Sequence, residues 1–184
     1  MNSFICRRRD VLIAGLGLSL AKTLPAQDDP AASRPKEGDF LVKTTDTTAT
    51  PLTPTDIRAG GRQVMAWAMD PADKTVRSAS RLNRILLVRL DSAKLTAETK
   101  SRAADGVVAY SAICTHAGCE VTEWVPEKQI LFCPCHESTF DPADAAKVID
   151  GPAVKILPAL PLGLAEGKLI VLKTFTAPVT FETQ

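Results

Sequence analysis

The side chains of this 184-residue chain with the clearest capacity for chemistry lie in two short boxes between positions 114 and 138. Thiolate sulfur and neutral imidazole nitrogen are ligands that iron and zinc accept, and both boxes contain both groups. The first box is Cys114-Thr115-His116-Ala117-Gly118-Cys119, and the second is Cys133-Pro134-Cys135-His136-Glu137-Ser138. Together they hold four of the five cysteines and both histidines of the chain. This combination favours metal binding with mixed cysteine and histidine ligands.

The two boxes resemble those of Rieske iron-sulfur proteins, and the resemblance is specific over 106–153. It implies one [2Fe-2S] cluster in which two thiolates hold one iron and two imidazoles hold the other. Cys114 and Cys133 would then bind a buried iron, while His116 and His136 would bind an outer, reducible iron. Each box would supply one ligand to each iron.

The resemblance also implies a disulfide between Cys119 and Cys135, which would join the two cluster loops. Neutral imidazole donates less charge to iron than thiolate does, so such a cluster accepts an electron more readily than one held by cysteines alone. Rieske potentials span roughly −150 to +300 mV, against about −400 mV for plant-type ferredoxins. The resemblance therefore implies electron exchange with quinols or cytochromes.

Two other interpretations of the boxes remain open, both as binding modules. Two cysteines and two histidines can bind zinc, although structural zinc sites usually pair their ligands as Cys-x(2–4)-Cys and His-x(3–5)-His. The four cysteines of the boxes can also be structural, in a degenerate Rieske fold without metal. The spacing Cys-x-His, interleaved with two further cysteines, disfavours both interpretations.

The histidine count limits the function further. Oxygenases that use a Rieske cluster feed a second, mononuclear iron, whose site needs two more histidines and a carboxylate. The chain has only two histidines, His116 and His136, and the resemblance assigns both to the cluster. We therefore expect an electron carrier or a carrier subunit, with no catalytic residue of its own.

The amino-terminal residues predict export. Arg7, Arg8 and Arg9 precede an uncharged apolar run over 11–21, which is the order of a basic region and an apolar region in a signal peptide. The pair Arg8-Arg9 resembles a twin-arginine signal, which we place at 1–26. That route exports folded proteins, so it suits a cluster inserted in the cytoplasm, and the expected location is the periplasm.

The apolar run is shorter than the roughly 20 residues that cross a bilayer, which favours cleavage of the signal. Small residues around Ala21 and Ala26 offer cleavage sites. An uncleaved signal that anchors the protein, or peripheral membrane association, is the alternative. Cys6 is the odd cysteine and would be lost with a cleaved signal.

The rest of the chain is predicted to be one all-β unit. A linker is expected over 27–38 and a Rieske domain over 39–184, with an antiparallel base and an inserted cluster-binding subdomain at about 111–154. Short apolar or β-branched runs, which favour strands, occur at 85–88, 107–110, 130–132 and 169–172. A hairpin is expected over 121–132, a hairpin turn at Glu166-Gly167, and a brief helix over 96–102 with Thr96 as its cap. With 22 basic and 21 acidic residues, the composition does not suggest a nucleic-acid partner.

Four residues near the boxes match Rieske positions that tune the cluster. Ser138 lies where proteins of cytochrome bc complexes place a hydroxyl that bonds a bridging sulfide, which raises the potential. Phe140 lies where high-potential members have a tyrosine, so a lower potential than theirs is expected. Gly151 and Pro152 resemble the start of the family's proline loop, which shields the cluster, with Val154 in place of a second proline.

Within the family, the resemblance favours the small subunit of arsenite oxidase and related stand-alone exported proteins. The expected function is therefore to pass single electrons between a donor enzyme or quinol and a cytochrome-type acceptor. The expected partners are a larger oxidoreductase subunit, a c-type cytochrome and quinol. The Gly-Pro-Ala loop resembles the bc type more closely, so a Rieske subunit of a quinol:cytochrome c reductase is the alternative.

Overall fold

The computed structural model describes residues 29–182, and most of the regular structure in this part of the chain is β-strand. The strands are β1 (Phe40–Lys43), β2 (Val64–Met69), β3 (Ile85–Arg89), β4 (Val107–Ser111), β5 (Glu123–Val125), β6 (Ile130–Cys133), β7 (Ser138–Asp141), β8 (Lys147–Asp150), β9 (Leu162–Ala165) and β10 (Lys168–Val171). The helical elements are one short α-helix, α1 (Ala97–Lys100), and the 3-10 turns η1 (Pro30–Ala32), η2 (Pro54–Asp56) and η3 (Arg81–Asn83). The predicted all-β class is confirmed.

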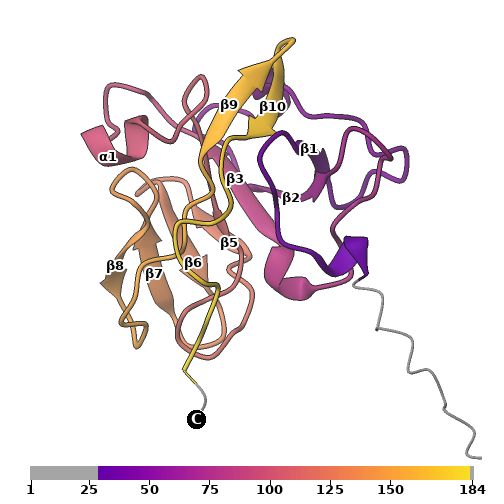
Figure 1. Cartoon of the computed structure of the whole chain (residues 1–184). Coiled ribbons are helices and arrows are strands. Elements are labelled where there is room, and N and C mark those ends of the chain that lie inside the picture. Colours follow the sequence, from indigo (N-terminus) through magenta and orange to yellow (C-terminus); the bar gives the residue numbers. More distant parts are fainter. Residues whose placement is uncertain (1–28, 183–184) are drawn as a thin grey trace, which may run out of the picture.

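The strands form two antiparallel sheets (Figure 1). A six-stranded base sheet has the order β4-β3-β2-β1-β10-β9, and a four-stranded sheet has the order β5-β6-β7-β8. All strands of the smaller sheet fall between β4 and β9 in sequence, so the subdomain with both boxes is an insertion in the base. The insertion begins and ends side by side, because the Leu160 N–H donates to the Ala109 carbonyl at 2.9 Å.

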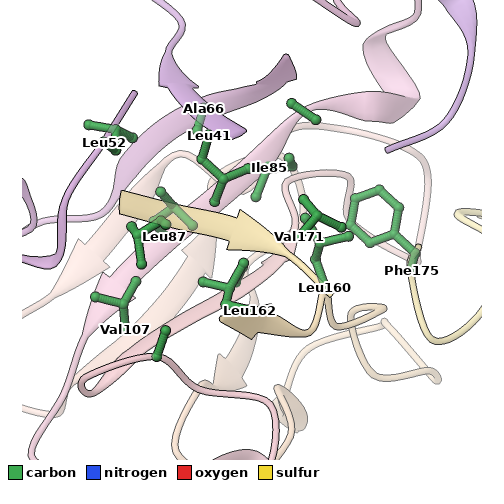
Figure 2. Close-up of a cluster of buried hydrophobic side chains, with 14 of the residues drawn as sticks. Leu41, Leu52, Ala66, Ile85, Leu87, Val107, Leu160, Leu162, Val171 and Phe175 are labelled. Atoms are coloured by element: carbon green, nitrogen blue, oxygen red, sulfur yellow. The ribbon is translucent and has the colours of Figure 1, made fainter. Parts of the chain in front are cut away.

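Strand β3 is buried on both faces and separates two hydrophobic cores. Ile85 and Leu87 belong to a base core, which Figure 2 shows together with side chains of β1, β4 and β10. Leu86 and Val88 point to the other face and join a second core with the inserted subdomain. Successive side chains of a strand alternate between faces, so a strand covered on both sides is apolar throughout, as this one is. The second core includes Cys114 and Cys133, one cysteine from each box, so it anchors both boxes to β3.

The local elements that the sequence predicts are confirmed. The first three apolar runs lie in β3, β4 and β6, and the fourth covers most of β10 and ends one residue beyond it. The hairpin expected between the boxes is formed by β5 and β6. The Thr96 side chain caps α1 by accepting from the Thr99 N–H. Glu166 and Gly167 join β9 to β10 with φ of +51° and +74°, the left-handed backbone that a tight hairpin turn needs.

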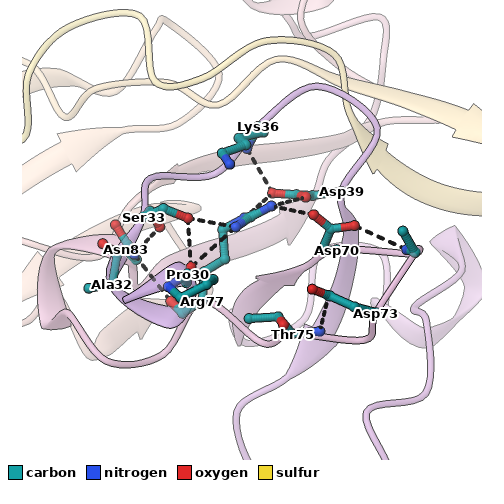
Figure 3. Close-up of polar contacts among 11 residues, drawn as sticks. Pro30, Ala32, Ser33, Lys36, Asp39, Asp70, Asp73, Thr75, Arg77 and Asn83 are labelled. Carbon is teal, nitrogen blue, oxygen red and sulfur yellow. Dashed lines mark hydrogen bonds and ion pairs between the residues drawn. The ribbon is translucent and has the colours of Figure 1, made fainter. Parts of the chain in front are cut away.

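The segment predicted as a linker, 27–38, is described over all but its first two residues and packs against the base domain (Figure 3). Arg77, which is 1% exposed, donates from Nη1 to Ser33 Oγ at 2.6 Å and from Nε to Asp39 Oδ2 at the same distance. Nη1 also donates to the Pro30 carbonyl at 3.3 Å. The composition of 27–38 does not reveal these contacts, because the donor, Arg77, lies about 40 positions further along the chain.

The predicted signal, 1–26, lies outside the described residues, so export by the twin-arginine route stays a prediction. Within 29–182 there is no helix with the length and apolar character that a membrane crossing requires.

Candidate metal centre

The two boxes are loops at one end of the inserted subdomain. The first box follows β4, and its turn is closed by hydrogen bonds from the Cys114 N–H to the Cys119 carbonyl at 2.7 Å and from the Gly118 N–H to the Cys114 carbonyl at 3.1 Å. The second box connects β6 to β7, and the Glu137 N–H donates to the Cys133 carbonyl at 3.0 Å. These bonds close each loop into a tight turn.

The structure brings all four predicted ligands together, arranged in two pairs. Cys114 and Cys133 are free thiols, 2% and 1% exposed, and lie within hydrogen-bond reach of each other. The imidazoles of His116 and His136 lie farther out, with ring centroids 4.6 Å apart and planes at 85°. His116 is half-buried and His136 is exposed. The sulfur pair therefore faces the second core, and the imidazole pair lies at the surface.

The two thiols share their protons unequally. The pKa of Cys114 is lowered to about 6, chiefly because its sulfur accepts a hydrogen bond from Cys133. The same hydrogen bond, followed by burial, raises the pKa of Cys133. A bound cation would favour the thiolate form of both side chains.

The predicted disulfide between Cys119 and Cys135 is present, with 6.5 Å between the two Cα atoms. It joins the end of the first box to the middle of the second, across 16 positions of sequence. The two ligand loops are therefore tied to each other covalently.

Two of the four predicted tuning residues, Ser138 and Phe140, lie beside the thiol pair. Ser138 is fully buried, lies within hydrogen-bond reach of Cys114, and accepts from the Ala153 N–H at 3.1 Å. Phe140, also fully buried, belongs to the core cluster that includes both thiols. Gly151 has a φ of +89°, and a Cβ there would lie 2.5 Å from the Ser138 Cα, so only glycine fits.

Pro152 and Val154 are exposed on the loop after β8, and Val154 is 67% exposed. One contact of this loop was missed from the sequence: Thr115, 3% exposed, donates from Oγ1 to the Lys155 carbonyl at 2.6 Å. The sequence feature that could have indicated this bond is the hydroxyl of Thr115 between two predicted ligands, Cys114 and His116. The bond ties the loop after β8 to the first box.

The arrangement fits a two-iron cluster better than a single ion. Two buried thiols and two outward imidazoles supply two ligands to each of two irons, as mixed ligation requires. Across residues 29–182, no group of three or more histidine, cysteine or acidic side chains is placed to hold one metal ion. A structural zinc site needs four ligands around one ion, so this geometry disfavours the zinc interpretation.

Comparison with known proteins gives the same assignment. The family model described as "Rieske [2Fe-2S] domain" matches residues 54–161. The chain is 38% identical over 133 residues to the cytochrome bc1 complex Rieske iron-sulfur subunit of Streptomyces lividans, covering 70% of this chain and 78% of that protein. It is 48% identical over 75 residues to the putative respiratory nitrate reductase subunit Rieske of Haloferax mediterranei, covering 40% of this chain and 33% of that protein.

Among solved structures, the plasma membrane Rieske protein PetC3 of Synechocystis is similar with a TM-score of 0.37 and 22% identity, over 58% of this chain and 84% of that one.

Proposed function

Because the chain belongs to the Rieske [2Fe-2S] family and so carries one cluster for electron transfer, we propose that Cys114, His116, Cys133 and His136 hold that cluster. The observation that carries the proposal is the pairing of the four side chains, with two thiols in contact below and two imidazoles 4.6 Å apart above. A bound cluster supplies one-electron chemistry at a potential that its surroundings tune.

The protein residues determine where electrons enter and leave. Cys114 and Cys133 are shielded from water by the second core, while the exposed imidazole of His136 lies at the surface that a partner can approach. Ile149, Val154 and Ile156, on and after β8, are exposed apolar side chains on the same subdomain. Exposed apolar residues beside a redox centre suit a docking surface for another protein.

We propose that the donor is an enzyme subunit or quinol and that the acceptor is a cytochrome-type protein, with the chain acting as a carrier or a carrier subunit. The imidazole nitrogens that do not bind metal can lose protons in the oxidised state, which couples electron gain to proton gain. The midpoint potential should then fall with rising pH in the alkaline range.

A second candidate is the Rieske subunit of a quinol:cytochrome c reductase. It is supported by 38% identity to the Streptomyces lividans protein over most of that protein's length. This candidate requires that the chain copurifies with cytochrome subunits from native membranes and accepts electrons from quinol in that complex. A carrier of the first kind would be recovered without them.

A periplasmic location is also proposed, with export of the folded protein. The Cys119–Cys135 disulfide supports it, because disulfides persist in oxidising compartments and are rare in the cytosol. A chain with Arg8 and Arg9 both replaced by lysine should stay in the cytoplasm, and fractionation of cells that express the two forms tests this. Equal export of both forms would contradict the twin-arginine assignment.

The deciding experiment is a redox titration of the purified protein followed by EPR, with iron and acid-labile sulfide assayed on the same sample. A rhombic signal on reduction, with a midpoint in the range of roughly −150 to +300 mV, is expected. Cys114→Ser and Cys133→Ser should each abolish the signal. Zinc without sulfide, and no signal, would contradict the proposal.

A further inference from the structure

The chain after β10 runs from the base sheet alongside the four-stranded sheet (Figure 1), and we name Phe175–Glu182 the C-terminal strap. Two side chains anchor it in the base core: Phe175 is 9% exposed and Val179 is 5% exposed. Thr176 adds two hydrogen bonds to Ala159, with its N–H donating to the carbonyl at 2.8 Å and its Oγ1 accepting from the N–H at 3.0 Å. The strap is thus a fixed part of the base domain.

The far end of the strap lies on the first box. The Glu182 N–H donates to the His116 carbonyl at 2.9 Å, so the strap bonds the backbone of a predicted ligand. The Phe181 ring covers Gly118, where a Cβ would come within 2.9 Å of the ring carbons Cγ and Cδ1. Gly118 also has a φ of +75°, so both the backbone and the ring exclude a larger residue there.

Two arginines at η3 also contact the first box. The Arg81 guanidinium lies 5.3 Å from the centroid of the Phe181 ring, and its Nη1 donates to the Gly118 carbonyl at 2.5 Å. Arg84 forms an ion pair with Glu120 at 2.8 Å, one residue beyond the disulfide cysteine of the box. The strap and the two arginines therefore hold the loop at His116, Gly118 and Glu120.

We propose that Phe181 and Arg81 are positioning residues that fix the first box, and thereby the imidazole of His116, in the geometry that the metal centre needs. The inference rests on the proposed function, since it concerns a residue that we assign as a ligand. Both side chains contact Gly118, which lies between the predicted ligand His116 and the disulfide cysteine Cys119. Both act through the backbone of residues 116–118, whose other hydrogen bonds close the turn within the loop itself.

The physical reason is that a tight turn on its own does not determine how it sits on the domain. Ligand orientation in metal sites depends on partners outside the ligand set, and removing such a partner typically costs roughly 10- to 100-fold in metal affinity. Here the partners come from distant parts of the chain. Contacts between them, Phe181 with Arg81 and both with Gly118, make one unit.

The test compares Phe181→Ala and Arg81→Gln with two controls in the purified holoprotein. Phe181→Tyr keeps the ring, and Val42→Ala removes a buried side chain from a separate small cluster of the base sheet. We expect the first two variants to lose the cluster roughly 10-fold faster than the wild type at a temperature where all remain folded, and to shift or broaden the EPR signal. Phe181→Tyr should behave like the wild type. Val42→Ala should leave the EPR signal unchanged even if it lowers the melting temperature as much as Phe181→Ala does.

The positioning role would be overturned if Phe181→Ala kept the wild-type signal and rate of cluster loss, or if Val42→Ala lost the cluster equally fast at equal thermal stability. Amide hydrogen exchange separates this outcome from failure of the proposed function. Phe181→Ala should raise exchange over residues 114–120 in the protein with or without metal. A wild-type chain with no Rieske signal would contradict the proposed function. Unchanged exchange over 114–120 in Phe181→Ala would contradict the positioning role of Phe181.

Discussion

Ser138 accepts a hydrogen bond from the backbone N–H of Ala153, with 3.1 Å between Oγ and nitrogen. Because an N–H already occupies one lone pair of the oxygen, the hydroxyl proton is directed to another acceptor, and the Cys114 sulfur is within reach. One buried hydroxyl therefore links β7, the loop after β8 and the thiol pair.

Ser138→Ala is expected to lower the midpoint potential. The hydroxyl withdraws charge from sulfur, and the reduced state, which has more negative charge, gains more from it. A difference of about 1 kcal/mol between the two states corresponds to roughly 40 mV for one electron. Redox titration by EPR measures the shift, and Thr139→Ala, the adjacent position with its side chain on the other face of β7, should leave the potential unchanged. A potential equal to that of the wild type in Ser138→Ala would refute this role.

Phe140→Tyr is expected to raise the potential by a similar amount. Phe140 is fully buried in the core cluster that contains Cys114 and Cys133, and high-potential relatives of this kind are expected to have a tyrosine hydroxyl on a cysteine sulfur there. A new hydrogen bond to sulfur stabilises the reduced state by about 1 kcal/mol, or roughly 40 mV. Phe140→Leu is the control: it should lower the melting temperature without raising the potential. An intact cluster with an unchanged or lower potential in Phe140→Tyr would count against the prediction.

Loss of the Cys119–Cys135 disulfide is expected to destabilise the protein and release the cluster faster. The bond closes a loop of 16 positions, and the chain entropy that it removes from the unfolded state corresponds to about 3 kcal/mol of stability. The double variant Cys119→Ser with Cys135→Ser should therefore melt on the order of 10 °C lower, by calorimetry. Visible absorbance should also decay sooner, and a mild thiol reductant should reproduce both effects in the wild type. A double variant that matches the wild type in both would show that the bond is dispensable.

Asp39→Asn is expected to be strongly destabilising. The Asp39 carboxylate pairs with the Arg77 guanidinium at 2.6 and 2.8 Å, with exposures of 2% and 1%. The variant removes this main partner of a buried cation and leaves the half-buried Asp70, at 3.0 Å, as its remaining carboxylate. Breaking such a pair from one side costs about 3–5 kcal/mol. Denaturant unfolding measures the loss.

Two matched variants test the reason for that loss. Glu98→Gln removes an exposed pair with Arg102 and should change the unfolding free energy by less than about 1 kcal/mol. The double variant Asp39→Leu with Arg77→Met should recover part of the stability, because no charge then remains buried. Equal effects of Asp39→Asn and Glu98→Gln would show that burial does not matter here.

Tyr110 is expected to make stability fall at high pH. Burial raises the pKa of its phenol above the usual value of about 10, and its hydroxyl donates to the Pro142 carbonyl at 2.8 Å. The unfolded chain then releases this proton before the folded chain does, so the stabilisation is complete below about pH 10 and is lost as pH rises above it.

Tyr110 is the only tyrosine of the chain, so tyrosinate absorbance in the near ultraviolet follows this group alone. The absorbance should rise only when the protein unfolds. Tyr110→Phe should show a shallower alkaline loss of stability, together with a cost of about 1–3 kcal/mol at neutral pH for the unpaired Pro142 carbonyl. Ionisation of Tyr110 in the folded protein near pH 10 would contradict the pKa shift.

The amino-acid sequence by itself determined the features that depend on neighbouring residues. The spacing of thiols and imidazoles in the two boxes, the apolar runs of β3 and β4, the cap at Thr96 and the turn at Glu166-Gly167 are local patterns. Each follows from ligand chemistry, side-chain alternation or backbone conformation within a few positions. For that reason the all-β class and the boxes that resemble those of Rieske proteins follow from the sequence alone.

The tertiary structure alone decided which distant residues support those features. No local pattern at Arg77 indicates that it holds Asp39, and nothing in Phe181 indicates that it covers Gly118. The Arg77–Asp39 contact forms within the base domain, where the pairing of β1 with β2 brings the two residues together. The Phe181–Gly118 contact forms because the end of the chain lies beside the insertion that leaves the base sheet after β4. Packing and buried charge depend on such long-range placement, and side-chain type leaves it open.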